Sequence, residues 1–142
     1  MDRFSLSHLS DQELIESFEA SLGELQASTA RMLECIAQVD ALGVFRDAGY
    51  ETLEEFCLAE SGIDSEEVVA FVQVARASRE FPGILQAIEQ GHHEVTTLSL
   101  VVPYLTSERA AELLVTTKHM SARRLRNFLR ERFGAAPGAA TD

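Results

Sequence analysis

The clearest structural signal in this chain is the stretch SDQELIESFEASLGELQASTARMLECIAQVDALG, residues 10–43. Its first residues, Ser10 and Glu13, match the capping-box pattern S-x-x-E, which predicts that a helix begins there. Apolar residues then recur three or four positions apart, with no proline and only Gly23 before Gly43. This spacing predicts one long helix of about 30 residues, about 45 Å long at 1.5 Å per residue. Two helices that meet near Gly23 are the alternative.

The long helix carries a regular apolar seam. A domain of this size does not need a core helix of that length, so the helix is predicted to pack against a second chain as well as its own core. The residues predicted to take part in self-association are Leu22, Leu25, Met32, Ile36 and Val39. A helix that serves only the core of its own chain is the alternative.

The remainder of the chain also shows helix signals. A second capping box at Thr52 and a serine cap at Ser121 predict two further helix starts, and glycines and prolines separate the apolar segments. No stretch of useful length alternates with the period of a β-strand. We therefore predict an all-α fold, a single domain of about seven or eight helices in residues 1–133. Residues 134–142 are predicted to be a disordered tail or linker.

Composition limits the class of protein. The 142 residues are 46% apolar, enough to build a core, and 23 acidic against 12 basic side chains give a net charge of −11. That charge opposes binding to nucleic acid over the whole surface. No apolar run has the length of a signal peptide or a membrane span, so we expect a cytoplasmic protein without membrane contact. Cys35 and Cys57 are predicted to be reduced thiols in the core.

The charge is distributed unevenly along the chain. Residues 1–70 hold sixteen acids and three bases, a net −13, whereas residues 71–142 hold seven acids and nine bases, a net +2. Within the second half, residues 118–132 carry six bases and one acid, a net +5. The arginines on this segment are predicted to bind an anion or a partner protein: Arg123, Arg124, Arg126 and Arg130. Two alternatives are that these arginines only form a solvated face, or that the acidic half of the same chain neutralises them.

Catalytic and metal-binding patterns are missing from the sequence. His92 and His93 are adjacent and therefore cannot chelate one ion as two histidines four residues apart on a helix do. The clustered glutamates stand at predicted helix starts, where the helix dipole accounts for them. There is no glycine-rich phosphate loop and no nucleophile motif. We predict a protein that is not an enzyme and needs no metal or cofactor.

A series of short motifs resembles the helical N-terminal domain, of undefined function, of bacterial HNH endonuclease-like proteins. The resemblance extends over about residues 5–133. In that family a nuclease module with metal-binding histidines and an asparagine normally follows the helical part, and this chain ends before one. The motifs are Ser5-Leu-Ser-His-Leu-Ser-Asp-Gln-Glu-Leu14, Ala37-Gln-Val-Asp40, Ala48-Gly-Tyr50 with Phe56-Cys57, Ala75-Arg-Ala-Ser-Arg-Glu-Phe-Pro82, and Gly91 onward to Val102-Pro-Tyr-Leu-Thr106.

A shorter segment, Phe81 to Gly91 followed by Glu94-Val-Thr-Thr-Leu98, is similar to the helix-turn-helix region of chromosome and plasmid partition proteins. Together these features favour a non-catalytic helical module for protein–protein interaction or regulation. Its partner is expected to be another protein, with a second copy of this chain as one candidate. The alternative is a DNA-associated module that uses the helix-turn-helix-like segment and the basic C-terminal helix.

Overall fold

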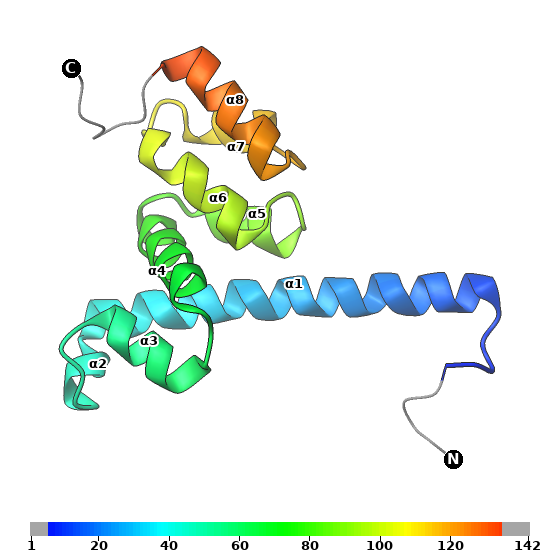
Figure 1. Cartoon of the computed structure of the whole chain (residues 1–142), viewed down its shortest axis with the longest axis horizontal. Helices are drawn as coiled ribbons and strands as arrows, with labels where there is room; N and C mark the ends of the chain where they lie inside the picture. The colour runs from blue at the N-terminus through cyan, green and yellow to red at the C-terminus, as the bar shows by residue number, and fades with distance from the viewer. Residues whose placement is uncertain (1–5, 135–142) are drawn as a thin grey trace.

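The computed structural model describes residues 6–134 and confirms the all-α fold. The predicted tail, apart from Gly134, lies outside the described residues. No strand occurs in residues 6–134, and the elements follow one another along the chain (Figure 1). They are α1 (Asp11–Leu42), α2 (Val44–Asp47), α3 (Leu53–Ser61), α4 (Ser65–Glu80), α5 (Gly83–Glu89), α6 (Val95–Val101), the 3-10 helix η1 (Val102–Tyr104), α7 (Ala110–Thr116) and α8 (Ala122–Phe133).

Helix α1 is continuous, as the apolar spacing predicts. The capping box is complete: the Ser10 hydroxyl accepts the backbone N–H of Glu13, and the Glu13 carboxylate accepts the backbone N–H of Ser10. Gly23 causes no break, and the helix ends at Gly43, whose φ of 67° lies in the left-handed region that favours glycine. The 32 residues span about 48 Å at 1.5 Å per residue.

Helix α4 is the centre of the hydrophobic core. Its side chains Val68, Val72 and Val74 are almost completely buried, and α1, α3 and α6 all pack against it. Helix α5 packs against the C-terminal half of α1, and α8 packs on α6 (Figure 1). The core is therefore built on the second half of α1, while α8 forms an outer layer at the other side of α6.

Two motifs of the family resemblance meet in one ion pair. Arg76 on α4 donates two hydrogen bonds, of 3.1 and 3.2 Å, to the carboxylate of Asp40 on α1. Glu54 on α3 lies 3.7 Å from the same guanidinium group. These contacts link α1, α3 and α4 through side chains that stand far apart in the sequence.

The structure differs from the sequence patterns at three places. Residues 44–50, which have the pattern of a turn, contain the short helix α2, which begins directly after Gly43. Helix α6 begins at Val95, ahead of the threonines Thr96 and Thr97 that have the pattern of a helix start; the backbone N–H of its cap residue Glu94 donates to the Thr97 hydroxyl at 3.3 Å. The prediction of two core thiols is wrong for Cys35, which is exposed on α1, and right for Cys57, which is buried.

Candidate interaction surfaces

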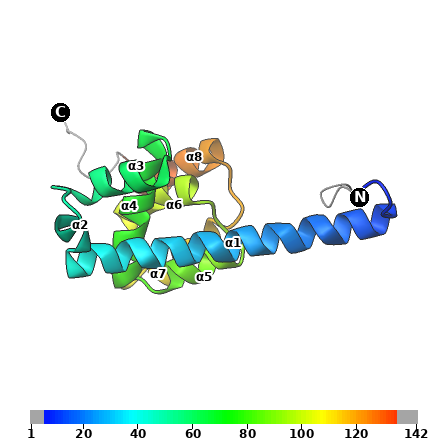
Figure 2. The same cartoon turned by 90° about the horizontal axis from the view of Figure 1, so that it is seen from below.

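The N-terminal half of α1 projects beyond the rest of the molecule. The first buried residue of α1 is Ala30, so the turns before it contribute no fully buried side chain to the core. Two views at right angles show this part of the helix extending past the other helices (Figures 1 and 2). We call residues 11–25 the projecting arm. Within residues 6–134 none of the arm's side chains is buried, which is unusual because most helical stability in proteins comes from packing one apolar face.

The projecting arm nevertheless carries an apolar face. Phe18 is 67% exposed and Leu25 is 63% exposed, and their neighbours along the same side are also exposed. Positions three or four apart share one side of a helix, so these side chains form one surface. We call it the arm stripe: Leu14, Ile15, Phe18, Leu22 and Leu25. Such an unpartnered apolar face marks an interaction surface.

The predicted self-association seam is divided by the structure. Ile36 is only 6% exposed, and Met32 and Val39 are partly buried against the same core. These three residues therefore pack inside their own chain. Leu22 and Leu25 lie on the projecting arm and remain accessible. One continuous apolar side of α1 thus fills the core at its C-terminal end and faces solvent at its N-terminal end.

The acidic side chains of the arm lie mostly away from the stripe. Residues 11–25 contain five acids and no base, a net charge of −5. At 3.6 residues per turn, Glu13, Glu16 and Glu24 fall on the side opposite the arm stripe. Serines and glutamines occupy most positions at its edges. The arm is consequently an amphipathic helix with an acidic rear surface.

A groove continues the arm stripe onto the body of the protein. It has a volume of about 580 Å³ and lies between α1 and the helices beside it. Apolar side chains of Leu22, Leu25, Phe71 and Val95 contribute to its lining. Glu67 and Glu94 also line the groove. A helix that packs along the arm stripe can extend into this groove, where it meets both apolar and acidic groups.

A second surface lies on α8. Its apolar residues Leu125 and Leu129 are buried, whereas Arg123, Arg124, Arg126 and Arg130 are exposed. We call these four the arginine face. None of their guanidinium groups makes an ion pair with a residue that the structure describes. Neutralisation by the acidic half of the chain, one of the alternatives from sequence, is therefore not observed within residues 6–134.

The C-terminal end of α8 is held by a separate set of contacts. Arg132 donates two hydrogen bonds to the carboxylate of Glu112 on α7, one of them 2.7 Å long. This pairing lowers the pKa of Glu112 to about 2. Phe133 stacks on Tyr104 with ring centres 4.8 Å apart, and the Arg109 guanidinium covers the ring of Phe133 at 4.6 Å. Arg132, the fifth arginine of α8, thus pairs within its own chain and does not belong to the arginine face.

A polar link between two loops holds the N-terminal end of α8. The backbone N–H of His119 donates to the carbonyl of His92 at 2.8 Å. The buried His93 ring lies 2.8 Å, Nε2 to Oγ1, from Thr117, whose hydroxyl donates to the carbonyl of Leu113. Burial is the main cause that lowers the pKa of His93 to about 4, so the ring is neutral at pH 7. Sequence reasoning missed this link because His93 and Thr117 are 24 positions apart.

No family model, curated protein or solved structure matches this chain. The resemblance to the helical domain of HNH endonuclease-like proteins therefore stays a prediction, and function must be argued from the surfaces themselves.

The segment similar to partition proteins does form two helices joined by a turn, α5 and α6. Helix α6 contains no lysine or arginine, and Val95, Leu98 and Val101 are buried. Among the described residues no three histidine, cysteine or acidic side chains are grouped to hold a metal ion. The same residues include no helix with both the length and the apolar character to cross a membrane.

Proposed function

We propose that this protein is a non-catalytic protein–protein interaction module, and that the arm stripe is its docking surface. The observation that supports the proposal is the exposure of five large apolar side chains on one side of the projecting arm, the part of α1 in which no side chain is buried by the described residues. Exposed apolar faces of this kind are recognised by another amphipathic helix, through anchors three or four residues apart. Regulation by such docking is consistent with the expected relation to nuclease-bearing proteins.

Charge selects the kind of partner. The arm has a net charge of −5, and Glu67 and Glu94 add negative charge to the groove. A second copy of the chain brings the same acids to the interface, and juxtaposed like charges are unfavourable. The partner that fits is therefore an amphipathic helix of another protein, with an apolar stripe flanked by lysine or arginine.

The proposal is tested with two synthetic helical peptides that share one leucine pattern. One peptide has lysine at the flanking positions, and the other has glutamate there. Fluorescence anisotropy at 150 mM salt measures their affinity for the protein. We expect the lysine peptide to bind and the glutamate peptide to bind at least ten-fold more weakly.

Two double variants separate docking on the arm from general attraction to an acidic protein. Phe18→Glu/Leu25→Glu changes the arm stripe, and Val69→Glu/Val115→Glu adds the same charge at side chains that are 58% and 61% exposed elsewhere. Binding of the lysine peptide should be lost in the first variant and retained in the second. Equal binding by both variants contradicts the proposal, because charge alone then explains the affinity.

A further inference from the structure

The arginine face of α8 is a basic surface that docking on the arm does not use. The chain has almost twice as many acidic as basic side chains, yet these four arginines have no carboxylate partner among the described residues. Arg76 and Arg132, by contrast, are both held by carboxylates of their own chain. Arg31, Arg46 and Arg79 also lack a carboxylate partner among the described residues, but each stands alone on a different helix. Only α8 brings four unpaired guanidinium groups together, where an external anion can reach them.

We propose that the arginine face binds the phosphate backbone of duplex nucleic acid. Arg123, Arg126 and Arg130 stand three and four positions apart and therefore line one side of α8. They extend over about 10 Å of the helix axis at 1.5 Å per residue. An α-helix fits the major groove of duplex DNA, which is about 12 Å wide.

The type of side chain on this face favours nucleic acid over an acidic protein. Asn127 lies next to the arginines, and arginine and asparagine are among the side chains that donate to phosphates and to base edges. Protein interfaces have apolar or aromatic residues at their centre. No large apolar side chain of α8 is exposed, and the nearest exposed one along the chain is Val115 on α7.

Burial places the contact on α8 rather than on α6. Helix α6 is the second helix of the segment that is similar to partition proteins, but it has no basic residue and packs between α4 and α8. Helix α8 covers it, so a duplex that approaches from this side meets α8 first.

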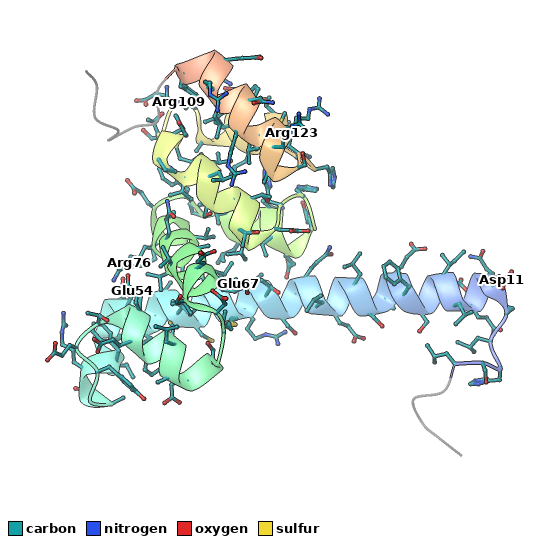
Figure 3. The ribbon with its side chains drawn as sticks, in the orientation of Figure 1. Asp11, Glu54, Glu67, Arg76, Arg109 and Arg123 are labelled. Carbon is teal, nitrogen blue, oxygen red and sulfur yellow. The ribbon has the colours of Figure 1, made fainter. Side chains whose placement is uncertain are left out.

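Figure 3 shows Arg123 on α8 and Asp11 at the end of the projecting arm, in separate parts of the molecule.

The acidic half of the chain limits the affinity and orients the complex. Phosphates are repelled by the net −13 of residues 1–70, so a duplex can approach only with that half turned away. Binding through arginine–phosphate contacts releases counterions, and the logarithm of the affinity falls by about 0.9 per contact for each tenfold rise in salt. Four contacts predict a slope of about −3.6.

The test measures binding of the full chain to a fluorescent 24-base-pair duplex by anisotropy, between 25 and 200 mM salt. Arg126→Gln/Arg130→Gln removes two residues of the arginine face. Arg31→Gln/Arg79→Gln is the matched control, because it makes the same change in net charge at arginines outside α8. We expect the α8 variant to bind at least ten-fold more weakly at 50 mM salt, with the slope reduced in magnitude by about 2. The control should bind nearly as the unchanged protein does.

Three outcomes overturn the inference: no binding at 25 mM salt, equal losses in both double variants, or tighter binding of poly-glutamate than of the duplex. The last result assigns the surface to an acidic protein. Circular dichroism and thermal unfolding establish that both variants are folded, which is expected because the changed side chains are exposed. The arm variant Phe18→Glu/Leu25→Glu should bind the duplex with a normal slope, so the two proposals fail or succeed separately.

Discussion

His93 donates its Nε2–H to the hydroxyl oxygen of Thr117 across 2.8 Å, in a place where both side chains are buried. The histidine must be the donor in this hydrogen bond, because the Thr117 hydroxyl already donates its hydrogen to the carbonyl of Leu113 at 2.7 Å. Nδ1 of His93 then carries the lone pair, and it has no partner among the described residues. This bond joins the loop before α6 to the loop before α8, and so it positions the helix that bears the arginine face.

Removing the acceptor should destabilise the protein. Thr117→Val leaves the buried Nε2–H of His93 without a partner, which costs about 1 to 3 kcal/mol in the free energy of unfolding. Urea denaturation measures the change. Thr96→Val, at an exposed position on α6, is the control and should change stability by less than about 0.5 kcal/mol. Equal effects at the two positions would show that the buried bond contributes nothing.

Stability should fall in mild acid. The pKa of His93 is lowered to about 4, from 6.5 in the unfolded chain, so between these values the unfolded state binds a proton that the folded state does not. The neutral, buried His93 ring therefore contributes its full share to the free energy of unfolding above pH 6.5, and this share is lost as the pH falls to 4. At about 1.4 kcal/mol per pKa unit, the loss has an upper limit of about 3 kcal/mol. Urea denaturation at pH 7.5, 5.5 and 4.5 measures the decline.

The variant His93→Gln provides the control for this pH dependence. Glutamine can donate an N–H to Thr117 and does not titrate, so most of the decline between pH 6.5 and 4.5 should disappear. Below pH 4.5 both proteins should lose further stability, because the lowered pKa of Glu112 means that its carboxylate must then be protonated. An unchanged slope in His93→Gln would assign the decline to other groups.

The two ends of α1 should respond differently to truncation of a leucine. Leu33→Ala creates a cavity at a side chain with no exposed surface, and should cost about 2 to 5 kcal/mol. Leu25→Ala, on the projecting arm, should cost less than about 0.5 kcal/mol. The midpoints of urea unfolding compare the two. A large loss for Leu25→Ala would mean that the arm packs against the body in solution.

The projecting arm should not bring about self-association at low salt. The arm's net charge of −5 opposes pairing of two copies, and this repulsion is screened at high ionic strength. Sedimentation velocity at 50 μM protein is expected to show a monomer in 50 mM salt. A dimer under these conditions that is lost in Leu25→Glu would instead assign the arm stripe to a second copy of the chain, as the apolar seam predicts from sequence.

Local patterns in the sequence determined the all-α class, the long first helix and several helix starts. These features depend on residues a few positions apart: the Ser10 and Glu13 cap, the three- and four-residue apolar spacing, and the glycine at position 43. The basic segment at residues 118–132 was equally visible, because charge is a property of composition. Its exposure on the outer side of α8 was not.

Only the tertiary structure decided which part of each pattern faces the core. The apolar seam of α1 looks uniform in sequence, but α4 and α5 cover its C-terminal half and leave Phe18 and Leu25 in solvent. The ion pair of Arg76 with Asp40 and the bond of His93 with Thr117 join residues 36 and 24 positions apart. Periodicity reports which side of a helix is apolar, whereas the packing of other helices determines how much of that side is buried.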